Sequence, residues 1–181
     1  QIIPTFEKIF SRPFREGFSS EDLRRGYLRT VALHELAHSY LYYKHAVQNL
    51  KELFLTVEEL AATVLGLRMA GYLLLKDRIT NKQMESMIVT YLCRSFYLAG
   101  EGRNDKFMLN YSLSGTIFVN YLLQSGAIKR KERLIFPNFM KIFVALHDLV
   151  NILEGLLSTG NYQDVNLFIS KYGKFPHFLV N

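Results

Sequence analysis

The 181-residue sequence contains a single cysteine, Cys93, and only four prolines. One cysteine excludes an intramolecular disulfide and a zinc site built from several thiolates. Any metal bound by this chain must therefore be held by histidine and carboxylate side chains. With 49% hydrophobic residues, the sequence lacks the composition of a disordered chain and is long enough to form one well-filled core.

The sequence also lacks the charge pattern that is typical of nucleic-acid binding. The formal net charge is +6, but the one dense basic run covers residues 129–133 and contains no aromatic residue that could stack on a base. We therefore expect no nucleic-acid partner.

A long stretch without charge, residues 107–128, could in principle span a bilayer. Polar side chains recur through this stretch, namely Asn110, Ser112, Ser114, Thr116, Asn120, Gln124 and Ser125. We expect a buried central helix there and no membrane span. The chain begins with Gln1, which indicates a processed or truncated N-terminus and leaves the compartment unknown. The single cysteine and the lack of a visible signal peptide favour the cytoplasm.

No segment shows the sustained period-two alternation of a strand, so the predicted fold class is all-α. Residues 1–19, which include Pro4 and Pro13, are expected to form a loop-rich leader. A single compact helical domain of metal-binding, catalytic type should follow over residues 20–181. Capping and turn signals predict about six helices in it. These cover residues 20–46, 56–76, 80–99, 105–125, 136–157 and 161–173.

The most informative motif is His34-Glu35-Leu36-Ala37-His38, within the first predicted helix of that domain. Two histidines four residues apart share one helix face, so both imidazoles can reach one zinc ion at about 2.0–2.1 Å. Glu35 is then placed to act as a general base toward water. The alternative is a pair of core histidines beside a chance glutamate.

A catalytic zinc site needs a third protein ligand. A third histidine six residues after His38, behind a glycine turn, is one common solution, but Lys44 and Leu41 occupy those positions. The other solution is a glutamate from the next helix, which opens with Glu58 and Glu59.

Glu59 is the better candidate of this pair. It continues a stripe of small residues, one turn apart, that lets the two helix backbones approach closely: Ala62, Gly66 and Ala70. The spacing predicts Glu59 as the third ligand and Glu58 as a neighbour that hydrogen-bonds a ligating histidine. The alternative is that Glu59 closes a capping box with Thr56. His147 is a further candidate to line the site as a donor, although a core histidine is the more common role.

These residues resemble the zinc region of the dipeptidyl peptidase III family. Bacterial members have a similar histidine motif, followed by a Glu-Glu-x-x-Ala segment like the one that begins at Glu58. The resemblance covers most of residues 30–173, including residues 118–128, 158–163 and 171–173. It implies a helical catalytic lobe in which His34, His38 and Glu59 hold zinc and Glu35 is the base.

Two positions depart from the family pattern. The family usually has an acidic residue where Thr63 stands, expected to orient a zinc-bound histidine. It also tends to have a substrate-contacting histidine shortly before residues 120–122, whereas residues 107–117 contain none. The chain is also far shorter than the two-lobed members and lacks their second lobe.

The sequence therefore favours a zinc-dependent metallohydrolase, namely a peptidase or the catalytic lobe of one, with one zinc ion and a peptide substrate. The alternative is a non-catalytic helical metal-binding or interaction module derived from such a peptidase, which acts with a missing lobe or a partner chain. Thr63 and the missing histidine favour the module. Glu35 argues against it, because zinc storage or sensing needs no carboxylate at that position.

Overall fold

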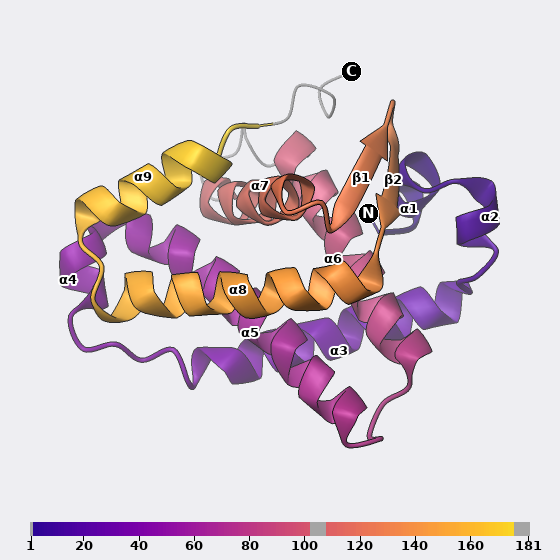
Figure 1. The fold of residues 1–181 in the computed structure, drawn as a ribbon, viewed down its shortest axis with the longest axis horizontal. Coiled ribbons are helices and arrows are strands. Elements are labelled where there is room, and N and C mark those ends of the chain that lie inside the picture. Colours follow the sequence, from indigo (N-terminus) through magenta and orange to yellow (C-terminus); the bar gives the residue numbers. More distant parts are fainter. Residues whose placement is uncertain (1, 102–107, 176–181) are drawn as a thin grey trace.

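A computed structural model describes residues 2–101 and 108–175 of the chain. The described residues are mainly helical, which confirms the predicted all-α class (Figure 1). The six predicted helices correspond to α3 (Ser20–His38), α5 (Phe54–Leu75), α6 (Asn81–Glu101), α7 (Leu109–Gln124), α8 (Phe139–Ser158) and α9 (Tyr162–Tyr172). The predicted start of the fourth helix near residue 105 lies outside the described residues.

The prediction of a loop-rich leader is wrong, because residues 2–15 form α1 (Ile2–Ile9) and α2 (Arg12–Arg15). Phe6, Ile9 and Phe10 are buried in the core, so this segment packs as part of the fold. Pro4 and Pro13 both lie in the first turn of a helix. A backbone N–H there has no partner within the helix, so a proline is tolerated.

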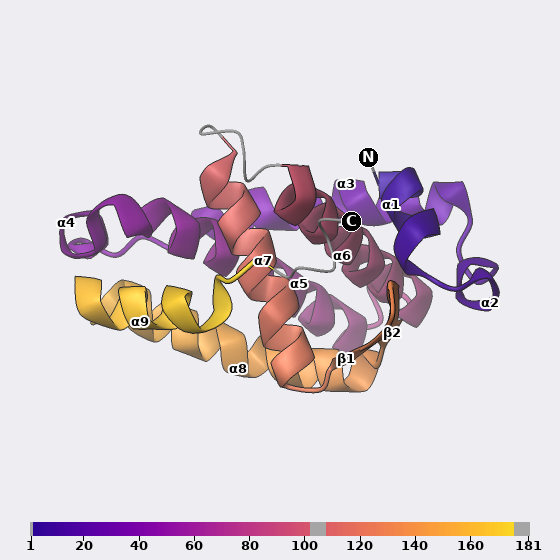
Figure 2. The same cartoon turned by 90° about the horizontal axis from the view of Figure 1, so that it is seen from above.

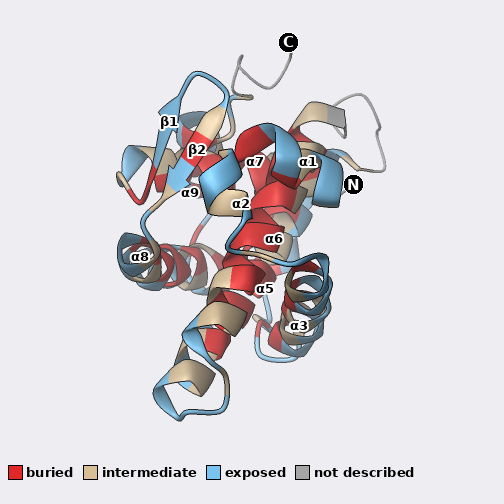
Figure 3. Cartoon of the chain, turned by 90° about the vertical axis from the view of Figure 1, so that its right-hand side faces the viewer, coloured by how far each residue is buried: buried red, intermediate tan, exposed pale blue. Residues whose placement is uncertain are grey.

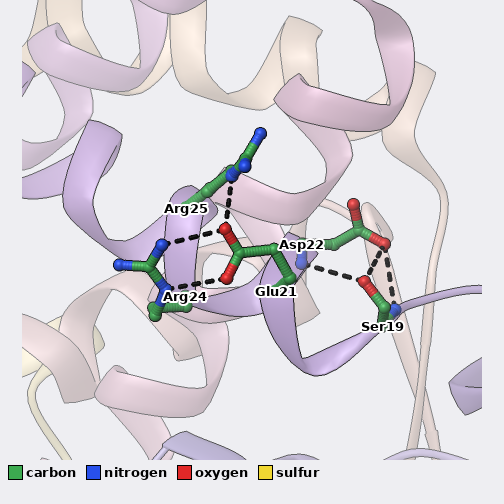
Figure 4. A network of polar contacts seen from close by, with 5 residues as sticks. All are labelled: Ser19, Glu21, Asp22, Arg24 and Arg25. Atoms are coloured by element: carbon green, nitrogen blue, oxygen red, sulfur yellow. Dashed lines mark hydrogen bonds and ion pairs between the residues drawn. The ribbon is translucent and has the colours of Figure 1, made fainter.

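The start of α3 is fixed by its predicted N-cap. The Ser19 hydroxyl accepts the Asp22 backbone N–H at 3.1 Å, and the Asp22 carboxylate accepts the Ser19 N–H at 2.9 Å (Figure 4). Glu21 accepts hydrogen bonds from Arg24 and Arg25, which lower the pKa of its carboxyl to about 2. Acidic groups in the first turn also suit the helix dipole.

The end of α3 differs from the prediction, which placed it near Ala46. The helix stops at His38, and the backbone N–H groups of Ser39, Tyr40 and Leu41 bond three residues back in a tightening turn. The Ser39 hydroxyl also donates to the Leu36 carbonyl at 2.7 Å. The chain then reverses through α4 (Ala46–Leu50) and the 3-10 turn η1 (Lys51–Leu53). This reversal leads into α5, which packs along α3.

The helices α5 and α6 form the centre of the molecule, between α3 and α8 (Figure 3). The buried residues of α5 are distributed around most of its circumference, as expected for a central helix. Seen from above, α7 runs across the direction of α8 and α9, and its N-terminal end lies toward the α3 side (Figure 2). It packs on both α5 and α6, which brings the start of α7 close to the histidine motif.

Gly66, within the predicted small-residue stripe, lies directly against the backbone of α3. Ala62, Gly66 and Ala70 are all buried. A Cβ atom at Gly66 would lie 2.9 Å from the carbonyl carbon of Leu33 and 3.0 Å from the backbone nitrogen of His34. The predicted close approach is therefore confirmed, and it occurs where the histidine motif begins.

A small hairpin was not predicted. Strands β1 (Ile128–Lys131) and β2 (Leu134–Pro137) pair antiparallel, and Glu132 in the turn has a positive φ of 56°. Most of the basic run at residues 129–133 therefore lies in β1. Phe136 and Pro137, which were expected to begin a helix, end β2 instead. Each strand has only four residues, too few for a sustained alternation. Ile128 and Ile135 are their buried contacts with the core.

The uncharged stretch before this hairpin forms the buried helix α7, as predicted. The Ser112 hydroxyl donates to the Leu98 carbonyl at 2.8 Å, and Thr116 donates to the Ser112 carbonyl at 2.8 Å. These two buried hydroxyls are thus hydrogen-bonded within the protein. Among the described residues, none of the helices has the length and apolar character that crossing a membrane requires.

We predict that Gly66→Ala destabilises the fold by about 1–3 kcal/mol, because the added methyl group meets the α3 backbone and no flexible side chain can move aside. Gly155→Ala is the matched control. Gly155 lies in α8 and a Cβ atom there meets nothing within 4 Å, so this change should stabilise the protein by up to ~1 kcal/mol. Urea unfolding measures both. Equal changes in the free energy of unfolding of the two variants would show that the contact between α3 and α5 tolerates a side chain at Gly66.

Candidate metal site

The two histidines of the motif face the same point, as their spacing predicts. The Nε2 atoms of His34 and His38 lie 3.0 Å apart, and the ring planes are inclined by 89°. Both side chains are mostly buried, with 14% and 27% of their surfaces exposed.

The carboxylate of Glu59 joins this pair from α5. Its Oε2 lies 3.3 Å from Nε2 of His34, and the ligand atoms of His34, His38 and Glu59 all lie within 4.8 Å of one another. The alternative capping box is not formed, because α5 begins at Phe54 and the Thr56 hydroxyl donates to Asn110 Oδ1 at 3.0 Å. Glu59 is therefore directed at the histidines and not at the helix end.

The second ring nitrogen of His38, Nδ1, has Glu58 as its hydrogen-bond partner. Nδ1 of His38 forms a short hydrogen bond with Oε1 of Glu58, which is the contact predicted for Glu58. A carboxylate accepts hydrogen bonds but does not donate them, so Nδ1 carries the proton. The lone pair of His38 is then on Nε2 and faces His34.

The second ring nitrogen of His34, Nδ1, has the Thr63 hydroxyl as its hydrogen-bond partner. The Thr63 hydroxyl donates to the Glu59 backbone carbonyl at 3.2 Å and lies 3.0 Å from Nδ1 of His34. With its hydrogen used in this way, the hydroxyl oxygen can accept an Nδ1 proton of His34. Thr63 thus orients the histidine, which is the task expected of an acidic residue at this position.

This pattern fits a zinc ion. When Nδ1 holds the only ring proton of each histidine, both Nε2 atoms direct lone pairs at the same point, and a shared cation removes their repulsion. Tetrahedral zinc at about 2.0–2.1 Å from each nitrogen would place them roughly 3.3 Å apart. A shift of about 0.3 Å from the observed 3.0 Å is sufficient. Two imidazoles and one carboxylate are also a common ligand set of catalytic zinc.

The charge state of Glu59 agrees with this surrounding. Burial raises the pKa of its carboxyl, but in the metal-free protein a hydrogen bond from His34, the positive charges of His34 and His38 when these are protonated, and a hydrogen bond from Tyr111 outweigh burial. The net pKa lies below the usual value. Glu59 is therefore an anionic oxygen donor at neutral pH.

A cavity of about 360 Å³ opens beside the three candidate ligands. Glu35 is exposed and lies on its wall, outside the three-residue group, so it is free to contact a molecule in the cavity. The lining residues are Val31, His34, Glu35, His38, Glu59, Arg94, Met108 and Tyr111.

Two of these residues, Arg94 and Tyr111, were not identified from the sequence. Arg94 lies in α6 and Tyr111 near the start of α7. The charge of Glu59, burial and the hydrogen bond to Glu59 raise the pKa of Tyr111, which keeps its hydroxyl a donor. A single tyrosine or arginine within a helix has no local sequence signal that relates it to a distant histidine motif.

His147 is neither a core residue nor part of this site. It is exposed on α8, where its Nε2 lies 3.5 Å from Nδ2 of Asn151. Both interpretations of this histidine are therefore wrong.

Comparison with known proteins supports the resemblance at the level of the fold. No protein-family model matches the sequence, and no curated protein sequence is significantly similar to it. Solved structures do match. Dipeptidyl peptidase III (DPP III) from Caldithrix abyssi superposes with a TM-score of 0.82 at 20% identity, over 98% of this chain and 34% of the peptidase. DPP III from Corallococcus sp. strain EGB gives a TM-score of 0.83 at 18% identity, over 98% and 33%. The chain thus spans about a third of these peptidases and has the fold of that third.

Proposed function

We propose that this chain is a zinc-dependent metallohydrolase, acting as a peptidase or as the catalytic lobe of one. The observation that carries the proposal is the convergence of three ligand atoms, with both histidine Nδ1 atoms engaged by Thr63 and Glu58. His34, His38 and Glu59 would hold the ion. The oriented Nε2 lone pairs are what a metal site requires and what a chance cluster in a core lacks.

The proposed chemistry uses residues on the cavity wall. Zinc, when bound, supplies Lewis acidity toward a carbonyl oxygen and toward water. Glu35 takes a proton from the attacking water and returns it to the leaving amine. The Tyr111 hydroxyl, on the wall of the same cavity, donates its hydrogen to Glu59 and so holds the candidate ligand carboxylate in place.

The assignment of a peptide as substrate has a separate basis. The matching structures are of DPP III, and this chain has the fold of about a third of each. Fold alone does not determine function, so the ligand geometry carries the metal assignment and the likeness suggests only the substrate class.

A non-catalytic metal-binding or interaction module is the second candidate. One observation favours it: residues 107–117 contain no histidine. Glu35, which lies in the cavity outside the ligand group, favours the enzyme.

The ligand assignment predicts different effects of the two neighbouring glutamates. Glu59→Gln removes an anionic ligand and should nearly abolish zinc binding. Glu58→Gln removes only the partner of His38 Nδ1 and should weaken zinc binding by about 10–100-fold. Competition titration with a chelating dye measures both affinities, and circular dichroism verifies that each variant is folded. If Glu58→Gln proves the more damaging change, Glu59 is not the third ligand.

The base assignment predicts that Glu35→Gln retains zinc and helicity but hydrolyses peptides on the order of 10²–10⁴ times more slowly. Zinc content by elemental analysis and hydrolysis of short peptides with free N-termini provide the two measurements. A wild-type protein that binds one zinc but cleaves nothing faster than Glu35→Gln would contradict catalysis and support the module.

A further inference from the structure

The cavity contains one cationic side chain, Arg94, among its described lining residues. Arg94 is partly buried in α6 and also borders a narrow inner crevice beside His34, Glu59 and the buried Tyr91. Its charge acts on the phenols of Tyr91 and Tyr111, as does the charge of Glu59. Arg94 therefore lies within electrostatic reach of the candidate metal site.

Arg94 has no carboxylate partner among the described residues. The ion pairs of the described chain join Arg12, Arg24, Arg25, His34 and His38 to glutamates, and none includes Arg94. Glu59, the buried carboxylate of the cavity, faces His34 and Tyr111 instead. A partly desolvated guanidinium without an anion is favourably paired by a ligand that brings one.

We propose that Arg94 binds a carboxylate of the substrate, so that the preferred ligand is a short peptide with a free carboxylate at its C-terminus or on an acidic side chain. The planar guanidinium matches a carboxylate through two parallel hydrogen bonds. A cavity of about 360 Å³ lies at the small end of the range for small-molecule sites, which favours a short ligand. This inference rests on the proposed function only in that it calls the bound peptide a substrate.

The charges in the cavity also give the ligand a direction. Glu35 on α3 and Glu59 on α5 repel an anionic group, whereas Arg94 on α6 attracts it. A peptide held in this way has its carboxylate at Arg94 and an uncharged peptide bond at the histidines and Glu35. Arg94 thus determines specificity and is not a metal ligand.

The test measures binding without turnover, in the Glu35→Gln background after zinc loading. Three tripeptides serve as probes: tri-alanine with a free C-terminus, its C-terminal amide, and an amide in which one alanine is replaced by glutamate. Calorimetry should show tri-alanine bound about 10–100-fold more tightly than its amide, the range for a hydrogen bond to a charged group. Adding Arg94→Gln should abolish this preference, and Arg94→Lys should restore part of it.

The matched control is Arg68→Gln, which removes one positive charge from an exposed residue of α5 outside this cavity. It should leave the preference for tri-alanine over its amide unchanged. Zinc content and helicity should be the same in every variant. Tight binding of the glutamate-containing amide, lost in Arg94→Gln, would identify an acidic side chain as the source of the carboxylate.

The outcomes separate this inference from the proposed function. Equal affinity for acid and amide, or no binding of any peptide, overturns the role of Arg94 even if the wild type hydrolyses peptides. A preference that depends on Arg94, in a protein whose wild type hydrolyses none of them, supports the carboxylate site and contradicts the peptidase.

Discussion

The close contact between the α3 and α5 backbones is the constraint on which the candidate site depends. Gly66 leaves no side chain between α5 and the peptide group that joins Leu33 to His34. Glu59 and Thr63, which lie on the same helix, therefore reach the first histidine from two sides. A wider helix spacing would separate the carboxylate from Nε2 and the hydroxyl from Nδ1 together. One glycine thus allows both the approach of Glu59 to the histidines and the contact between Thr63 and His34.

The sequence predicted the part of the site that follows from helix periodicity. The four-residue histidine spacing, the small-residue stripe and the choice of Glu59 needed only the knowledge that two consecutive helices pack together. Local sequence signals failed to predict those features of the fold that tertiary contacts determine. The leader is helical because Phe6 and Phe10 find a place in the core, and α3 ends at His38 because the turn that follows has its own hydrogen bonds.

Arg94 and Tyr111 illustrate the limit of sequence reasoning more directly. Their helices follow the motif by many residues, and neither position has a spacing that relates it to His34. They reach the cavity because α6 packs on α3 and α7 packs on both α5 and α6. Contacts of this kind depend on the arrangement of four helices, which no window of the sequence encodes. Residues 107–117 contain no histidine, but Tyr111 in that interval lines the same cavity and donates a hydrogen bond to Glu59.

The two histidines differ in the partner that holds them. Glu58 gives His38 a charged acceptor, whereas Thr63 gives His34 a neutral one. A carboxylate raises the basicity of the imidazole that it accepts from, and a hydroxyl only orients it. The threonine therefore keeps the geometry of the site while donating less electron density through His34 to a bound cation. A cation that received less donation from its ligands would polarise a carbonyl oxygen more strongly, so threonine at position 63 is compatible with the proposed Lewis-acid site.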